Sequence, residues 1–122
     1  MPFDILWKNL QDTKKRKILK RRRIWIRCAL RNSIQYQIDC FIRKNPKPYP
    51  DYQVDHKDFS FNRIVKNFLQ VNCLEFEKLP YHKKDNRFML KEPILSAFQY
   101  FHAMFARYQW LSTEENKHKY CN

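Results

Sequence analysis

The chain has 122 residues, and its apolar and aromatic contents of 43% and 16% suffice for one folded domain, which excludes a wholly disordered protein. Its 25 Lys and Arg residues against 12 Asp and Glu residues give a formal net charge of +13. A polyanion relieves such a surplus, so we expect nucleic acid as the partner, with an anionic membrane surface as the second choice. No run of 18 apolar residues occurs, so the sequence predicts no transmembrane segment.

The composition also limits turns, cofactor loops and cysteine chemistry. Glycine is absent, which excludes a Gly-rich phosphate loop and leaves the turns to Asn, Asp and Pro. The four cysteines (Cys28, Cys40, Cys73 and Cys121) have no C-x-x-C spacing, so we expect free or buried thiols. Abundant Lys, Asn, Ile and Phe without Gly is typical of an AT-rich coding genome, which points to an organelle (mitochondrion or plastid) or a virus.

The first predicted element is one long helix. After a short apolar anchor at residues 1–10, Asp12 or Thr13 is the expected cap of a helix that runs to about Lys44, since neither Pro nor Gly interrupts it before Pro46. At 1.5 Å per residue such a helix spans roughly 45 Å, more than a small domain is wide. We therefore expect part of it to project.

The basic residues of this helix are concentrated in its first half. Like charges one turn apart destabilise an isolated helix, and an anionic partner removes that penalty. A charged run is often only a solvated face, but this one contains no acidic residue and is interleaved with Trp25 and Ile26, which favours contacts with a phosphate backbone. The predicted nucleic-acid-binding residues are Lys14, Lys15, Arg16, Lys17, Lys20, Arg21, Arg22, Arg23, Arg27 and Arg31.

A stiff Pro-rich connector at residues 44–50 follows, so we divide the chain into an anchor and long basic helix at 1–45 and a second part at 46–122. The second part begins with a β-prone run around Tyr52 and Val54 that carries Asp55 and His56. An amphipathic helix with Ser60 as its N-cap comes next. Its expected buried stripe is Phe61, Ile64, Val65, Phe68 and Leu69.

The remaining elements are less regular. Asn72 is expected to end this helix, residues 74–79 to form a short strand or an irregular edge, and residues 80–87 a surface loop. Pro93 then opens a further helix. Its predicted inner face is Leu95, Phe98, His102, Phe105 and Tyr108. Ser112 and Glu115 form a capping box that starts a terminal helix containing Asn116.

Two places in the second part together resemble the HNH (ββα-metal) endonucleases. The first is Asp55-His56 before a helix, and the second is the tail at 111–119, in which Leu111, Asn116 and Lys119 keep the family's spacing. The resemblance implies that Asp55 and Asn116 hold a divalent metal ion, most simply Mg²⁺, and that His56 is the catalytic general base. These three side chains would then converge in space.

This chain also departs from the family pattern. The middle Asn is missing, with Arg107 near its slot and His102 as a substitute, and the longer path from His56 to Asn116 requires an insertion. The expected fold is therefore α+β and mostly helical, with a long basic N-terminal helix followed by a small HNH-like ββα-metal unit that carries a helical insertion.

Two main functions remain open at this stage, beside a third possibility, an accessory subunit of an organellar membrane complex that uses its charge on anionic lipid. One is a nucleic-acid-binding, HNH-like protein that hydrolyses phosphodiesters with a metal ion. The alternative is a non-catalytic rRNA-binding structural subunit of an organellar ribosome, within a large ribonucleoprotein assembly. In that case His56 and His102 are structural histidines, Asp55 caps a turn and Asn116 is a surface residue.

Overall fold

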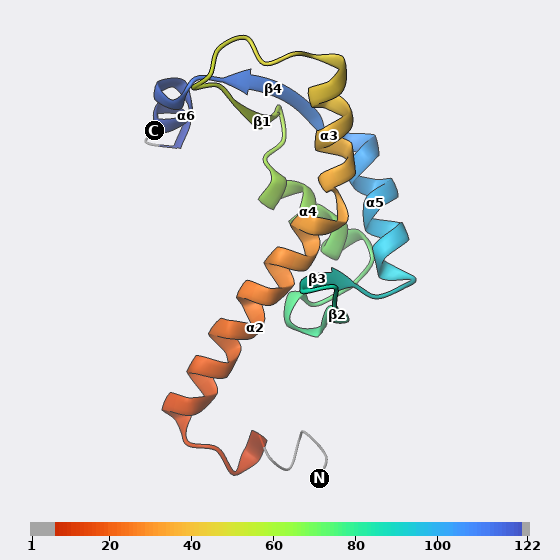
Figure 1. The fold of residues 1–122 in the computed structure, drawn as a ribbon. Helices are drawn as coiled ribbons and strands as arrows, with labels where there is room; N and C mark the ends of the chain where they lie inside the picture. Colours follow the sequence, from red (N-terminus) through yellow and green to blue (C-terminus); the bar gives the residue numbers. More distant parts are fainter. Residues whose placement is uncertain (1–6, 121–122) are drawn as a thin grey trace.

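The computed structural model describes residues 7–120, with side chains described up to residue 117. The fold is α+β and mostly helical, as the sequence predicts (Figure 1). Its elements are α2 (Asp12–Ser33), α3 (Gln35–Lys44), β1 (Gln53–Lys57), α4 (Phe61–Val71), the 3₁₀-helix η1 (Phe76–Lys78), β2 (Tyr81–Lys84), β3 (Arg87–Leu90), α5 (Ile94–Phe105), β4 (Arg107–Leu111) and α6 (Thr113–Tyr120). The expected anchor at 1–10 lies largely outside the described residues.

The predicted single long helix is wrong at Ile34, where the chain bends and divides into α2 and α3. Ile34 has φ −113° and ψ 7°. Just before it, the Ser33 hydroxyl donates to the Leu30 carbonyl at 2.5 Å, a back-bond that competes with the helical ladder and bends helices. The predicted cap is also wrong, because Gln11 occupies the N-cap position without a side-chain hydrogen bond.

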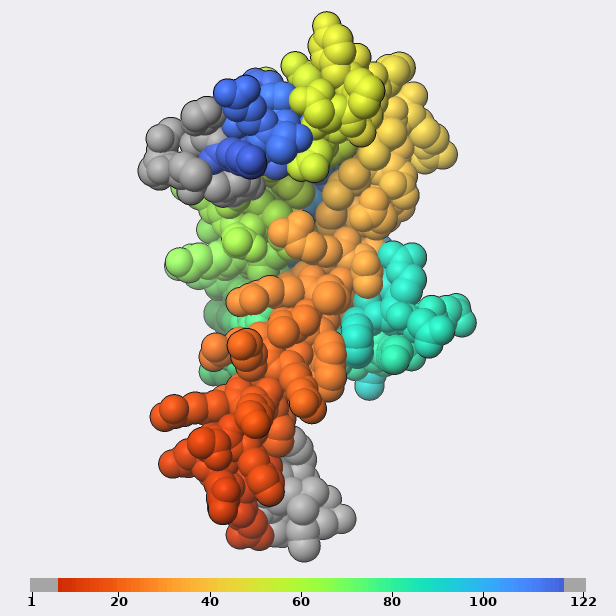
Figure 2. Space-filling view, turned by 60° about the vertical axis from the view of Figure 1, so that its left-hand side comes forward, coloured from red at the N-terminus to blue at the C-terminus, as the bar shows by residue number. Residues whose placement is uncertain are grey.

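The two halves of α2 have different surroundings. Its buried residues (Ile26, Ala29, Leu30 and Ser33) all lie in the C-terminal half. The N-terminal half extends beyond the rest of the molecule, as the red and orange segment shows in Figures 1 and 2. The expectation that part of the helix projects is confirmed.

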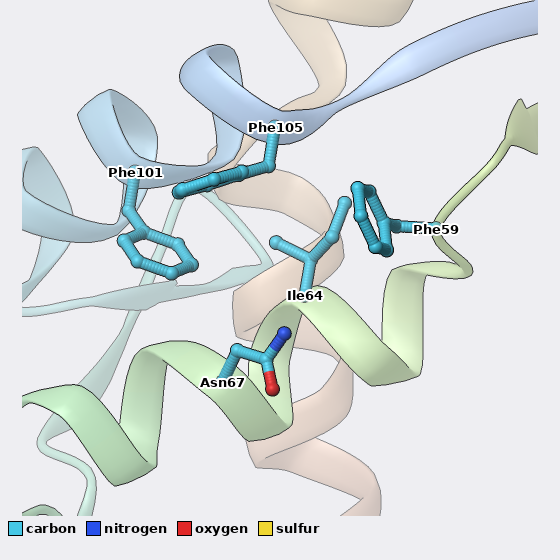
Figure 3. A pocket seen from close by; sticks show the side chains of 5 residues that line it. All are labelled: Phe59, Ile64, Asn67, Phe101 and Phe105. Atoms are coloured by element: carbon cyan, nitrogen blue, oxygen red, sulfur yellow. The ribbon is translucent and has the colours of Figure 1, made fainter.

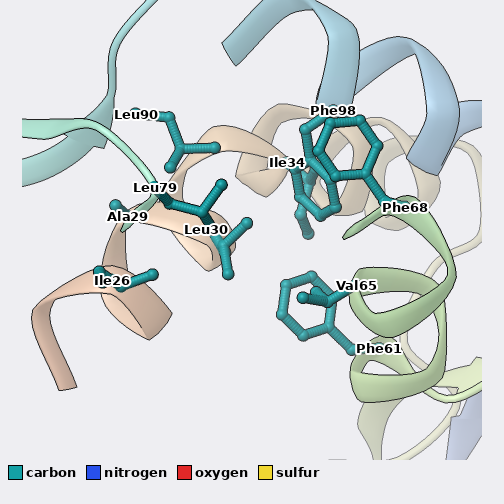
Figure 4. Packing of buried hydrophobic residues seen from close by; sticks show 10 residues of the cluster. All are labelled: Ile26, Ala29, Leu30, Ile34, Phe61, Val65, Phe68, Leu79, Leu90 and Phe98. Carbon is teal, nitrogen blue, oxygen red and sulfur yellow. The ribbon is translucent and has the colours of Figure 1, made fainter. Parts of the chain in front are cut away.

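The hydrophobic core joins α2 to the second part of the chain (Figure 4). Ile26, Leu30 and Ile34 lie in one buried cluster with Phe68 and Phe98, whose rings meet edge to face at 5.2 Å. The boundary expected at residue 45 therefore does not separate two cores.

The amphipathic helix α4 forms as predicted. The Ser60 hydroxyl accepts a hydrogen bond from the Arg63 amide at 3.1 Å and thus caps the first turn. Phe61, Ile64, Val65 and Phe68 are buried, and Leu69 is half-buried. Asn72 follows the last helical residue, and its side chain donates to the Phe68 carbonyl at 2.8 Å.

The surface loop predicted at 80–87 is wrong, because β2 and β3 form a hairpin there. Its two turn residues, Asp85 and Asn86, both have positive φ (51° and 62°), as a type I′ turn requires. Asp-Asn thus performs, in a chain without glycine, the turn that Asn-Gly usually makes. The hairpin packs on α2, where Phe88 stacks on Trp25 at 5.4 Å.

The predicted inner face of α5 is partly wrong. Phe98 and His102 are fully buried, but Phe105 is 40% exposed and Tyr108 lies in strand β4, beyond the end of the helix. Residues 74–79 contain η1 and no strand.

Strands β1 and β4 form a second antiparallel pair, and α6 follows β4 directly (Figure 1). The predicted capping box starts α6, with Ser112 and Glu115 exchanging two hydrogen bonds of 3.1 Å. The segment between β1 and β4 contains α4, η1, the β2–β3 hairpin and α5. Among the described helices, none is both long and apolar enough to cross a membrane.

Candidate functional site

Strand β1 carries Asp55 and His56 on opposite faces, since successive side chains of a strand alternate. In the β1–β4 register, His56 lies opposite Tyr108 and Asp55 opposite Gln109. The two predicted site residues therefore point into different surroundings.

His56 points inward. Its side chain is only 8% exposed, and its Nε2 lies 2.9 Å from Nε2 of His102, which is fully buried. His102 Nδ1 in turn lies 2.7 Å from Gln37 Oε1. These two contacts form a row of hydrogen-bonded side chains that runs from β1 through α5 to α3. The row joins residues that are up to 65 positions apart in the sequence.

The partners of Gln37 determine which ring nitrogens carry protons. Gln37 Nε2 donates to the Gln99 carbonyl at 3.0 Å, so its Oε1 is the acceptor that faces His102. His102 Nδ1 therefore carries a proton and donates it to Gln37. His102 Nε2 is then the acceptor of the 2.9 Å contact, and His56 Nε2–H is its donor.

This cluster disfavours charge. Burial, together with repulsion from His56, lowers the pKa of His102 to about 4, so His102 is neutral near pH 7. Burial also raises the pKa of the neighbouring Tyr108 hydroxyl, with a smaller contribution from Tyr36. The Tyr108 oxygen is buried without a hydrogen-bond partner in the described part of the chain. The buried surroundings of His102 therefore disfavour a charged ring at that position.

Asn116 lies on the other side of β1. Its Nδ2 donates to Gln53 Oε1 at 3.3 Å, and Gln53 is two residues from Asp55, on the same face of the strand. Asn116 Oδ1 is buried and has no hydrogen-bond partner among the described residues. The structure therefore brings Asn116 to the side of β1 that carries Asp55, whereas His56 faces away from both.

The metal and auxiliary residues are dispersed. Within the described part of the chain, no three His, Cys, Asp or Glu side chains gather into a group that could hold a metal ion. Arg107 donates to the Ala106 carbonyl at 2.8 Å and lies opposite Lys57, on the face of the sheet away from His56. His102 contacts His56 directly. Lys119 lies outside the residues whose side chains are described.

Four of the ten predicted basic residues line one groove along α2. Arg16, Lys20, Arg23 and Arg27 follow one another at intervals of three or four residues, the spacing of a single helix face, with Leu19 and Ile24 between them. We call these four residues the basic stripe. The groove has a volume of about 510 Å³ and lies on the exposed side of the helix.

Only part of the charge on α2 is neutralised within the protein. Arg23 pairs with Glu77 at 3.1 Å, Arg22 Nε donates to the Glu77 carbonyl at 2.8 Å, and Arg31 lies over the Phe61 ring. Arg16, Lys20 and Arg27 form no ion pair with any residue that the structure describes. The stripe is therefore exposed and largely uncompensated.

A small pocket between α4 and α5 is lined by no ionisable side chain. Phe59, Ile64, Phe101 and Phe105 surround it between α4 and α5, with the Asn67 amide as the one polar side chain among its lining residues (Figure 3). Its volume is about 80 Å³. It is a gap in apolar packing.

The sequence did not point to Gln37 or Tyr108 as neighbours of His56. Gln37 is a single polar residue on a helix, and no sequence pattern distinguishes it from a solvent-exposed one. Tyr108 lies in β4, and no local signal in 107–111 identifies β1 as the partner of that strand.

Comparison with known proteins identifies no relative: no protein-family model, no curated protein and no solved structure matches this chain.

Proposed function

We propose that this protein binds nucleic acid along its phosphate backbone, through the basic stripe of α2. The observation that carries the proposal is the position of Arg16, Lys20, Arg23 and Arg27 on one exposed face of a projecting helix. Among the described residues, Glu77 is their one carboxylate partner.

The geometry suits a polyanion better than a single small anion. Arg16 and Arg27 are eleven residues apart, so the stripe extends about 16 Å along the helix. Arg side chains bind phosphate oxygens through a planar fork of donors, and Lys side chains bind them as point charges. Such contacts supply affinity and position a strand without reading its sequence.

The test compares two double variants that each remove two positive charges. Arg16→Gln with Lys20→Gln removes half of the stripe, whereas Lys44→Gln with Lys47→Gln removes two exposed cations at the connector. Fluorescence anisotropy with labelled RNA and DNA oligonucleotides should show a large loss of affinity for the first variant and little change for the second. Equal losses would mean that only net charge matters, and would reject the stripe as the site.

A second candidate function rests on the β1–β4–α6 arrangement. Two antiparallel strands followed by a helix are what an HNH-like ββα-metal unit would contain, and Asn116 lies on the side of β1 that carries Asp55. A carboxylate and an amide oxygen are ligands suited to Mg²⁺, and the Asn116 oxygen lacks a protein partner among the described residues. Asp55 and Asn116 would hold the ion, which would supply Lewis-acid activation of a phosphodiester.

The position of His56 argues for the non-catalytic alternative. A general base must reach the water that it activates, and His56 Nε2 instead faces His102 in the interior. An RNA-binding structural subunit, such as one in an organellar ribosome, requires no rearrangement there.

A nicking assay separates the two candidates. Mg²⁺-dependent cleavage of plasmid DNA or of RNA, lost in both Asp55→Ala and His56→Ala, would establish the HNH-like activity. Tight binding by the wild type without any cleavage would leave the structural role.

A further inference from the structure

We propose that a second groove, between the middle of α2 and the segment formed by η1 and the start of β2, binds an unpaired nucleobase by stacking against Trp25. This inference rests on the proposed function and names its substrate class, single-stranded or bulged nucleic acid. The groove has a volume of about 490 Å³, within the range of small-ligand sites. Trp7, Ile18, Leu19, Trp25 and Tyr81 supply its apolar walls.

The aromatic wall is held in place from behind. Trp25 stacks on Phe88 with an interplanar angle of 18°, and Tyr81 meets Phe88 nearly edge to face at 6.0 Å. Trp25 nevertheless remains 38% exposed. A rigid indole that is supported on one side and partly open to solvent is a suitable stacking surface, since every base has a π-face.

The charges in this groove favour an anionic ligand. The Glu77 carboxylate is paired with Arg23, and Lys78 is paired with Glu75, both at 3.1 Å. Arg22 is positioned by the Glu77 carbonyl and lies 5.7 Å from the centre of the Tyr81 ring, and it forms no ion pair with any described residue. The net charge of the lining is therefore positive, which matches a nucleotide.

The second groove adjoins the basic stripe. Leu19 lines both grooves, and Arg22 and Arg23 are neighbours in the sequence that serve one groove each. A strand whose phosphates follow the stripe can therefore turn a base toward Trp25. A regular duplex keeps its bases stacked inside, so only unpaired nucleotides gain this contact.

The test compares a single-stranded oligonucleotide with one of equal length and charge whose bases have been replaced by abasic sites. Loss of one or more stacked bases should weaken binding roughly 5- to 100-fold. Equal affinities that still fall in the variant with Arg16→Gln and Lys20→Gln would overturn the base site and leave the proposed function intact. No binding of either oligonucleotide would overturn both.

Tryptophan fluorescence locates the contact. Because Trp7 also lines the groove, the comparison is made in a Trp7→Phe background. Binding of the normal single strand should quench the emission of that background, and adding Trp25→Phe, which retains an aromatic ring, should remove most of the quenching. Trp110→Phe is the control, because Trp110 lies in β4 and donates to the Asn45 carbonyl, away from this groove. Quenching that persists in Trp25→Phe and disappears in Trp110→Phe would reject the assignment.

Discussion

The His56 cluster and the basic stripe place their titratable groups in opposite surroundings, one buried and hydrogen-bonded, the other exposed. In the cluster, His56, His102 and Gln37 satisfy one another within 2.9 Å, in a buried place where the pKa of His102 is lowered and its ring is neutral near pH 7. In the stripe, Arg16, Lys20 and Arg27 are exposed and have no ion pair among the described residues.

The two regions therefore differ in role: buried polar groups contribute to stability, and exposed cations are available for association. A buried, hydrogen-bonded group contributes to stability, and its loss is costly because partners are left unsatisfied. An exposed, unpaired cation contributes little to folding but is available for association. His56, which the HNH resemblance marks as a general base, lies in the buried, hydrogen-bonded region, whereas the basic stripe lies in the exposed one.

Acid should produce the largest effect, on the cluster alone. The folded pKa of His102 is lowered from its ordinary 6.5 to about 4, so the unfolded chain binds an additional proton between these values. The free energy of unfolding contributed by neutral His102 is complete above pH 6.5, falls as the pH decreases and is lost below about 4. The predicted loss is about 3 kcal/mol, measurable by urea unfolding at several pH values.

His102→Gln serves as the control, since it keeps a polar side chain and removes the titration. Its stability at neutral pH should be lower, but its decline between pH 6.5 and 4 should be shallower than that of the wild type. An unchanged decline would assign the acid sensitivity to other groups.

Salt should produce the next largest effect, on the stripe alone. Each cation that neutralises a phosphate of a single strand contributes about 0.7 to the slope of log K against log salt concentration. Arg16→Gln with Lys20→Gln should therefore reduce that slope by about 1.4, whereas Lys44→Gln with Lys47→Gln should leave it nearly unchanged. Identical slopes for the two variants would remove the distinction between the stripe and other exposed cations.

Ser60→Ala should have a smaller effect, confined to stability. The variant removes the cap of α4, which follows β1 and supplies Phe61 and Phe68 to the core, and it should cost about 1 kcal/mol. Because the stripe does not depend on this cap, affinity for oligonucleotides should not change at temperatures where the variant is folded. A parallel loss of affinity would show that the two regions are coupled.

Glu77→Gln should have the smallest effect, and it touches both stability and binding. The exposed Arg23–Glu77 pair is worth about 1 kcal/mol or less, so unfolding should change little. Affinity should rise, by no more than about fivefold, because Arg23 is released to a phosphate. Asp39→Asn on α3 makes the same charge change away from the stripe and should leave affinity unaltered; a fall in affinity for Glu77→Gln would contradict the proposed use of Arg23.

Local signals in the sequence were sufficient for several elements. The Ser60 cap, the buried stripe of α4 and the Ser112–Glu115 capping box involve residues within one or two helical turns, so spacing alone specifies them. The projection of the N-terminal half of α2 was predicted from the length of a single helix to Lys44, although the structure divides that helix at Ile34.

Long-range pairings could not be predicted in the same way. The β1–β4 pairing joins residues about fifty positions apart, and nothing local in 107–111 identifies its partner. His56 faces inward, where its ring contacts His102, which in turn contacts Gln37. These contacts depend on how α3 and α5 pack, and the local sequence does not specify that packing. The Asp85-Asn86 turn was missed because two non-glycine residues adopt positive φ.

Lysine-reactivity footprinting tests most directly the claim that the basic stripe of α2 is the contact surface for nucleic acid. Lys20 in the stripe and Lys44 and Lys47 near the connector are all exposed in the free protein, so each should react with an acylating reagent. With a single-stranded oligonucleotide bound, we predict that Lys20 becomes protected while Lys44 and Lys47 react as before. Protection of Lys44 and Lys47 with unchanged reactivity at Lys20 would contradict the account.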